Sequence, residues 1–364
     1  MKFLFKILGW LLIAGFIAWG VYFAYQTFFA ANDAIERATQ NTQDKLIATE
    51  LPIKLANSNP VMSYFINSKT NAIYLISKNG QIFKTFGDGQ STEEVNKQTL
   101  PNLNSVAISP DGTKLVATFN YPLASVLAIY DTGTNAWERL PENTLTATFD
   151  PDSKKLAYLR TTSTGGELNV LDLTSKKAAK IMNLTIADGA LTWIEKDEII
   201  LSQKPTKELD LESWLINVNK KTITKLTSLS QGIMSLYGNS TYGLKLAYAN
   251  TKKDLTLFLT TSNGTELAVL PFVTLPSKCA FTEKYLYCAV PFFYPTGIKL
   301  PDDYLKRKFY SLDSIIKVDL DTLYPATLLD TTLEKIDVEQ LSVAGDRLMF
   351  VNRYDQKIYS LEIK

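Results

Sequence analysis

The sequence predicts an all-β protein, a β-propeller with seven blades as the best count and six or eight as alternatives, preceded by one N-terminal transmembrane helix. Three observations support this prediction. An apolar run occupies the start of the chain, apolar and polar residues then alternate with a period of two, and tight turns recur at nearly constant spacing. Alternation with a period of two is typical of strands that bury one face.

The composition excludes several classes of function. The 364 residues carry 38 basic and 37 acidic side chains, and a net charge of +1 provides no overall field to attract nucleic acid. The chain has no histidine, which excludes Ser-His-Asp and Cys-His catalysis and histidine-ligated metals. Two cysteines are too few for a zinc site made of cysteines alone. We expect no nucleic-acid partner and no cofactor; a calcium ion held by channel oxygens stays open.

An apolar run from Phe3 to Ala24, interrupted only by Lys6, predicts a transmembrane helix within residues 1–31, after a short cytoplasmic stub. Basic residues precede the run and acidic residues follow it, so the N-terminus is expected in the cytoplasm and the remainder outside. A cleaved signal peptide is the alternative, although its apolar stretch would be shorter. The polar residues 32–59 predict a stalk, and residues 60–364 predict the propeller domain.

Two repeats share the same order of strands and turns. Residues 103–140 and 145–182 each contain an apolar strand, a tight turn and three further strands. Proline at the second turn position presets the backbone angle, and Ser, Asp and Gly suit the other positions of a type I turn. The turn residues are Ser109, Pro110, Asp111 and Gly112 in one repeat and Asp150, Pro151 and Asp152 in the next.

The same turn position recurs along the rest of the chain. Four of the five steps between turns match the roughly 40 to 45 residues of a four-stranded blade, and the last step contains an insertion of about 20 residues. The turns begin at Ser109, Asp150, Glu195, Ser240, Thr282 and Val343, in steps of 41, 45, 45, 42 and 61 residues.

Counting the repeats gives the number of blades. Five complete units cover residues 103–140, 145–182, 189–227, 232–270 and 275–329. Three strands remain at each end, in residues 61–86 and 338–363, and these are too many to share one four-stranded blade. Seven blades therefore fit best, and Leu51–Ala56 could complete the last blade and close the ring.

The repeat resembles that of the TolB-like, WD-repeat-like propellers of bacterial envelopes. Residues 108–116 (ISPDGTKLV) match the family phrase F-S-P-D-G-x-x-L-A-F closely, and residues 149–158 (FDPDSKKLAY) match it nearly as well. Later units keep the strand rhythm without the Pro-Asp-Gly turn. The resemblance implies a propeller fold and a tendency to bind partners, and it implies no reaction.

Motifs of common catalytic sites are missing. The sequence contains no phosphate loop, no dinucleotide fingerprint and no G-x-S-x-G elbow. Carboxylates are the remaining acid/base candidates, yet aspartates at turns and strand ends commonly accept hydrogen bonds from nearby backbone N–H groups. We therefore expect a structural role, rather than a catalytic one, for Asp111, Asp131, Asp152, Asp172 and Asp319.

The two cysteines, Cys279 and Cys288, lie on the first two strands of the unit that contains the insertion. A two-residue turn at Glu283-Lys284 would place them directly opposite one another, close enough for a disulfide. Export from the cytoplasm favours oxidation. We expect a bridge, with a pair of buried thiols as the alternative.

The insertion, residues 291–320, combines aromatic and basic side chains of the kinds found in binding hot spots. It could bind a partner, its rings could fold back over the blade edge or the channel mouth, or its cations could touch lipid headgroups near the stalk. The candidate partner-binding residues are Phe292, Phe293, Tyr294, Tyr304, Lys306, Arg307, Lys308, Phe309 and Tyr310.

We expect a single-pass protein of the cell membrane whose extracytoplasmic propeller binds another envelope protein or a polymer and is not an enzyme. The membrane is itself a partner, through the N-terminal helix. The alternative is a carboxylate-dependent glycan hydrolase or lyase built on a propeller. No pattern in the sequence specifies the oligomeric state or the identity of the partner.

Overall fold

The computed structural model describes residues 53–55, 60–85, 92–98, 100, 102–120, 125–204, 212–226, 232–237, 241–248, 255–262, 264–330 and 335–363. All of them belong to one compact unit, Pro52–Lys364, and a second unit comprises Met1–Leu51. The predicted membrane helix and the stalk up to residue 52 lie outside the described residues. Within the described ranges, no helix is long and apolar enough to cross a membrane.

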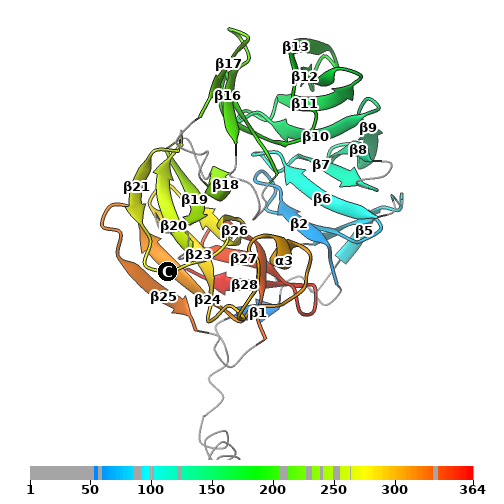
Figure 1. Ribbon diagram of the computed structural model, residues 1–364. Coiled ribbons are helices and arrows are strands. Elements are labelled where there is room, and N and C mark those ends of the chain that lie inside the picture. Colours follow the sequence, from blue (N-terminus) through cyan, green and yellow to red (C-terminus); the bar gives the residue numbers. More distant parts are fainter. Residues whose placement is uncertain are drawn as a thin grey trace, which may run out of the picture. The chain divides into compact units, whose positions relative to one another are not determined.

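The described strands form seven sheets of four antiparallel strands, the blades of a propeller (Figure 1). The all-β fold and the count of seven blades are thereby confirmed. Blade 1 contains β2 (Ser63–Ile66), β3 (Ile73–Ile76), β4 (Ile82–Thr85) and β5 (Thr92–Asn96); blade 2 contains β6 (Leu103–Ile108), β7 (Lys114–Phe119), β8 (Val126–Asp131) and β9 (Ala136–Arg139); blade 3 contains β10 (Thr144–Phe149), β11 (Lys155–Thr162), β12 (Gly165–Asp172) and β13 (Ala178–Leu184).

The second half of the ring repeats this order. Blade 4 contains β14 (Ala190–Glu195), β15 (Glu198–Ser202), β16 (Ser213–Asn217) and β17 (Thr222–Lys225); blade 5 contains β18 (Gly232–Tyr237), β19 (Tyr242–Tyr248), β20 (Leu255–Thr261) and β21 (Glu266–Val269); blade 6 contains β22 (Cys279–Phe281), β23 (Tyr285–Pro291), β24 (Asp313–Asp319) and β25 (Pro325–Leu329); blade 7 contains β26 (Val338–Ala344), β27 (Arg347–Asn352), β28 (Lys357–Glu362) and β1 (Ile53–Leu55).

Neighbouring blades bury their apolar faces against each other. The core between blades 1 and 2, for example, joins Phe65 and Ile76 of blade 1 to Leu115, Phe119 and Tyr130 of blade 2, all at most 1% exposed. Comparable cores join blades 2 and 3, 3 and 4, 5 and 6, and 7 and 1. Each blade is therefore stabilised through its neighbours, as in other repeat proteins.

The repeat turns also join neighbouring blades. The N–H of Gly112 donates to the C=O of Ser109 (2.8 Å), after Pro110 and Asp111, and the φ of Gly112 is +63°. A Cβ atom at Gly112 would lie 2.0 Å from the carbonyl oxygen of Ile66 in blade 1. Glycine is required here by the backbone angle and by this close approach.

The turn of blade 3 has the same form without the glycine. The N–H of Ser153 donates to the C=O of Asp150 (3.0 Å), with Pro151 and Asp152 exposed between them. The Asp150 carboxylate accepts hydrogen bonds from the N–H groups of Lys154 and Lys155, both at 2.7 Å. The aspartate thus stabilises its own turn.

Two sets of contacts close the ring between blades 7 and 1. Strand β1 pairs with β28, with Ile53 opposite Leu361, so the strand expected from Leu51–Ala56 completes the last blade. Nearer the centre, the Tyr64 hydroxyl lies 2.9 Å from the C=O of Gln340 and 2.7 Å from the C=O of Met349. Ring closure therefore joins the earliest described strand to the last.

Blade 1 contains one strand that the sequence pattern did not predict. Strand β5, with the sequence TEEVN, is mostly exposed and polar. It pairs with β4, and Gln81 Nε2 donates to the Glu94 carboxylate (3.0 Å). An outer strand in contact with water on both sides lacks the apolar alternation on which a strand prediction depends.

Candidate functional site

The insertion connects the second and third strands of blade 6. The N–H of Phe292 donates to the C=O of Leu312 (2.8 Å) and closes the base of the loop. The short helix α3 (Asp302–Leu305) lies in the middle of the loop. Figure 1 shows α3 beside β26 and β27, so the loop covers the junction of blades 6 and 7.

Four buried charged side chains lie beneath this loop, and we call them the ion cluster: Lys278, Asp313, Asp337 and Arg353. Lys278 Nζ lies 2.6 Å from Asp313 Oδ2 and 2.8 Å from Asp337 Oδ1, and Arg353 Nη1 lies 2.8 Å from Asp337 Oδ2. Each side chain is at most 1% exposed. Two positive and two negative charges balance, as burial away from water requires.

Asp337 connects the loop to blade 7. The Tyr304 hydroxyl of α3 donates to Asp337 Oδ1 (2.9 Å), and Ser311 donates through its hydroxyl (3.0 Å) and its N–H (3.1 Å). The Arg353 guanidinium, from the β27–β28 turn, stacks on the Tyr304 ring at 3.8 Å. The loop is thus held at its helix and at its C-terminal end by one carboxylate.

The electrostatics of the ion cluster follow from its burial. Burial raises the pKa of Asp313, although the neighbouring Lys278 acts in the opposite direction. Burial and the Asp337 carboxylate raise the pKa of Tyr304 well above its usual value. Asp313 and Asp337 have no exposed surface and so lack access to a polymer substrate. The ion cluster therefore positions the loop.

The aromatic residues of the insertion fall into two groups. Tyr304 is 5% exposed, and the partly buried Tyr294 and Phe309 pack on the same core. Phe309 contacts the rings of Tyr294 and Tyr304, with centroids 6.3 and 5.8 Å apart. These three rings fold back onto the blade, which is one of the three arrangements that the sequence left open.

The other rings point into solvent. Phe292 and Phe293 are 67% and 57% exposed and pack edge to face with each other. Tyr310 is also exposed and lies 5.2 Å, ring to ring, from Tyr354 of the β27–β28 turn. We call the following five exposed residues the exposed aromatic surface, although Leu305 is aliphatic: Phe292, Phe293, Leu305, Tyr310 and Tyr354.

The three basic residues of the loop each form an ion pair. The distances are 3.7 Å for Lys306–Asp302, 3.0 Å for Arg307–Glu339 and 2.7 Å for Lys308–Asp303. The salt bridge from Lys308 and the N–H of Lys299 hold the pKa of Asp303 below its usual value. These pairs neutralise much of the positive charge that the sequence suggested for this loop.

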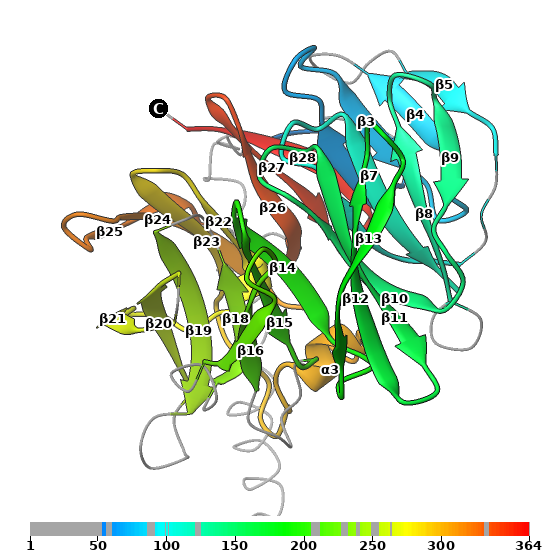
Figure 2. The same ribbon diagram turned by 90° about the horizontal axis from the view of Figure 1, so that it is seen from above.

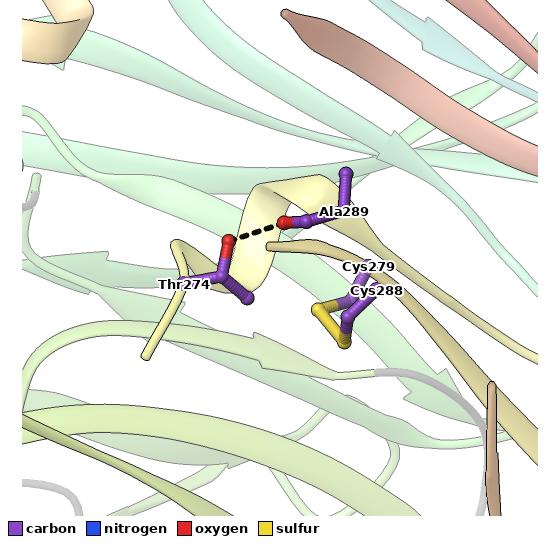
Figure 3. Close-up of a disulfide and its surroundings, with 4 residues drawn as sticks. All are labelled: Thr274, Cys279, Cys288 and Ala289. Atoms are coloured by element: carbon purple, nitrogen blue, oxygen red, sulfur yellow. Dashed lines mark hydrogen bonds between the residues drawn. A yellow bond between two sulfur atoms is a disulfide. The ribbon is translucent and has the colours of Figure 1, made fainter. Parts of the chain in front are cut away.

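The structure contains a disulfide between Cys279 and Cys288 (Figure 3). The two residues are directly opposite in the β22–β23 pair, with Cα atoms 4.1 Å apart, in the register expected from a turn at Glu283-Lys284. Both are buried in the core of blades 5 and 6. The bridge thus fixes the inner strands of blade 6 next to Lys278.

The carboxylates of the turns have structural roles. Asp131 accepts a hydrogen bond from the N–H of Gly133 (2.8 Å), Asp172 from Ser175 (2.7 Å) and Asp319 from Thr322 (2.9 Å). Among the residues that the structure describes, no three His, Cys, Asp or Glu side chains are grouped to hold a metal ion.

Sequence reasoning missed the ion cluster and Tyr354. Lys278 and Asp337 each come one residue before the innermost strand of consecutive blades. Charged residues at this repeated position, next to apolar strands, are the signal that could have revealed a buried ion pair between the blades.

Comparison with known proteins gives structural matches only. No protein-family model and no curated protein matches the chain. Oligogalacturonate lyase from Vibrio parahaemolyticus has a TM-score of 0.62 at 11% identity, over 87% of this chain and 95% of that one. The β-propeller domain of the Trilobed protease from Pyrococcus furiosus has a TM-score of 0.51 at 12% identity, over 85% and 93%.

TolB from Acinetobacter baumannii also matches, at 15% identity over 83% of this chain and 63% of that one. Its TM-score of 0.36 is too low to support a structural argument. The lyase and Trilobed protease matches extend over most of both chains, but at such low sequence identity they establish the architecture alone. The chain has the fold of a seven-bladed β-propeller.

Proposed function

We propose that the chain is a membrane-anchored, extracytoplasmic propeller that binds another envelope protein or a polymer through the exposed aromatic surface. The exposure of Phe292 and Phe293 is the observation that carries this proposal. Large aromatic side chains are enriched at binding hot spots, where they leave water on association.

The fixed position of the loop supports a binding role. Asp337 holds Tyr304 and Ser311, and Arg353 lies under the ring of Tyr310 at 5.0 Å. A surface that is already ordered loses less conformational entropy when a partner binds. The ion cluster therefore contributes to affinity without touching the partner.

The strand register favours a partner away from the point where the chain enters the propeller. The first residue of β1, Ile53, is opposite Leu361, whereas Tyr354 of the exposed aromatic surface precedes the other end of β28. The strand from Lys357 to Leu361 alone spans about 13 Å. The ion pairs of Lys306, Arg307 and Lys308 leave little uncompensated positive charge for contact with anionic lipid headgroups.

The binding surface can be tested by capture from an envelope extract with the full-length chain as bait. The double variant Phe292→Ala/Phe293→Ala is compared with the wild type and with Tyr324→Ala. Tyr324 is 73% exposed at the far end of blade 6 and is a matched control. We expect the double variant to lose at least tenfold in capture of a partner that the control retains, with unchanged thermal stability. Equal capture by all three proteins would refute the proposal.

The anchor is tested separately. The apolar run Phe3–Ala24 predicts that the full chain stays with membranes during alkaline extraction. Protease added to intact cells should cleave residues 60–364 only after the outer barrier is opened. A mature soluble form that begins near Asn32 would instead indicate a cleaved signal peptide.

The alternative is a carboxylate-dependent glycan hydrolase or lyase. One observation favours it: Glu138 and Glu142 line the same cavity of 760 Å³. Paired carboxylates in a cleft are the basis of glycoside hydrolysis. The purified chain, incubated with pectin and peptidoglycan fragments, would release reducing or unsaturated ends, and Glu138→Gln and Glu142→Gln would each stop the release. Without product from the wild type, this alternative is wrong for those substrates.

A further inference from the structure

A cavity of 760 Å³ lies between blades 2 and 3, which are neighbours in both views (Figures 1 and 2). Leu127 and Ile129 of β8 line one side, and Tyr158 and Leu171 of blade 3 line the other. Strand β9, the outermost strand of blade 2, has only four residues. The volume is within the roughly 300 to 1,000 Å³ of sites that bind small ligands. We call this cavity the interblade wedge.

One ion pair crosses the mouth of the interblade wedge. Lys176 of blade 3 contacts Glu138 of β9, with side chains 53% and 60% exposed. An exposed pair of this kind contributes little to stability, so a ligand can displace it. The pair also leaves the rim close to neutral, which favours an apolar ligand over a highly charged one.

The outer edge of blade 2 borders the interblade wedge. Strand β9 is the last strand of its sheet and pairs only with β8. The N–H of Leu140 donates to the C=O of Leu127 (2.8 Å). Because hydrogen-bonded positions alternate along an antiparallel pair, the N–H and C=O groups of Trp137 and Arg139 point away from β8. They form an edge to which another strand can pair.

We propose that the interblade wedge binds an extended peptide, which pairs with β9 as a fifth strand of blade 2. Every second side chain of such a strand would point between the blades, beside Glu138 of β9, and long apolar side chains could reach toward Tyr158, so apolar residues at alternate positions are selected. Backbone hydrogen bonds to Trp137 and Arg139 provide affinity, and the apolar side chains provide specificity. This site is independent of the exposed aromatic surface on blades 6 and 7.

The other two large cavities described lack this combination. A cavity of 500 Å³ is lined by innermost strands of blades 2, 3 and 4, and one of 540 Å³ is lined mainly by turns and strand ends of blades 7 and 1. Neither is bordered by the outermost strand of a blade. The interblade wedge therefore offers both an apolar interior and a pairing edge.

The test uses a phage-displayed library of random twelve-residue peptides selected on the full-length chain in lipid nanodiscs. Enriched peptides are synthesised, and their dissociation constants are measured for the wild type and two variants. Arg139→Pro removes the outward N–H, which an edge strand tolerates because no internal hydrogen bond is lost. Ala178→Trp fills the interblade wedge from an exposed position on β13. The matched control is Ile223→Pro, an outward position on β17, the outermost strand of blade 4.

We expect enriched peptides with apolar residues at alternate positions. Both interblade-wedge variants should weaken their binding at least tenfold, while Ile223→Pro and Phe292→Ala/Phe293→Ala bind as the wild type does. Circular dichroism and thermal melting confirm that the variants fold. Selection without the alternating pattern, or full binding by a folded Arg139→Pro and Ala178→Trp, overturns the proposal. Loss of binding in Phe292→Ala/Phe293→Ala would likewise place the peptides elsewhere, and so overturn it.

Discussion

The aspartates of the repeat turns and those beneath the inserted loop differ in their surroundings. Asp172 and Asp319 are near solvent and accept N–H groups from their own turns, within three residues of themselves. Asp313 and Asp337 have no exposed surface, and each depends on cations or donors far along the chain. The first pair stabilises local structure, whereas the second joins two blades and a loop.

The same difference appears in the pKa values. Hydrogen bonds from the backbone N–H groups of Ser175 and Thr322 hold the pKa of Asp172 and Asp319 below the usual 3.8. Burial raises the pKa of Asp313. The ionised form of an aspartate in a turn therefore favours folding. The ionised form of a buried aspartate favours folding only when its partners are in place.

The largest effect is expected from Asp337→Ala. Removal of this carboxylate leaves Lys278 and Arg353 buried with only Asp313 to balance them. Breaking a buried ion pair on one side costs about 3–5 kcal/mol, which urea unfolding can measure. The exposed turn residue Asp321 provides the control, since Asp321→Ala should change the free energy of unfolding by less than about 0.5 kcal/mol.

A second variant distinguishes charge imbalance from the loss of the hydrogen bonds that Asp337 accepts. Lys278→Met combined with Asp337→Asn keeps one cation and one carboxylate, Arg353 and Asp313. This double variant should be more stable than Asp337→Ala because no net charge is buried. A double variant as unstable as Asp337→Ala would show that the hydrogen bonds of Asp337, rather than its charge, hold the loop.

A smaller effect is expected from Asp111→Ala in the turn of blade 2. Its carboxylate accepts the N–H of Thr113 (3.0 Å) and the hydroxyl of Ser109 (2.8 Å). Loss of such bonds at a partly exposed site should cost about 1 kcal/mol by thermal or urea unfolding. A loss as large as that of Asp337→Ala would contradict the distinction between the two groups of aspartates.

The two groups should also respond to acid with opposite sign. Asp172 and Asp319, with lowered pKa values, stabilise the fold above pH 3.8, and this contribution is lost as the pH falls through their folded pKa values. The pKa of Asp313 is raised, so its contribution to the stability of the fold decreases as the pH rises from 3.8 through its folded pKa. Melting temperatures are measured between pH 2.5 and 6. Toward acid pH, the melting temperature of Asp172→Asn/Asp319→Asn should fall less steeply than that of the wild type. The melting temperature of Asp313→Asn should fall more steeply.

The smallest effect is expected from Lys306→Gln/Lys308→Gln. Both lysines are exposed, and their ion pairs with Asp302 and Asp303 are screened by solvent. The melting temperature should stay within about 2 °C of the wild type. A large decrease would mean that these lysines, like Lys278, help to hold the loop.

Local patterns in the sequence predicted most of the fold. Proline and aspartate in the turns, the period of two and the constant spacing located six of the blades, because these signals come from neighbouring residues. Strand β5 was missed since it is polar. The ion cluster was missed since only the folded ring brings Asp313 and Arg353 to Lys278 and Asp337, the two that share a repeat position. The division of the aromatic rings into buried and exposed groups depends on that cluster and was equally hidden.

Ring closure by β1 has to wait until β28 has been synthesised. Ile53 and Leu361 pair across about 300 residues, so the first described strand is synthesised long before its partner. At roughly 5–20 residues per second, β1 waits about 15–60 s for β28. Such distant pairing is slow to form, and the open edge is exposed to aggregation meanwhile. A chaperone that holds β1 during synthesis would therefore have its greatest effect on the yield of closed rings. Truncation of β28 would leave both β1 and β27 without their pairing partner.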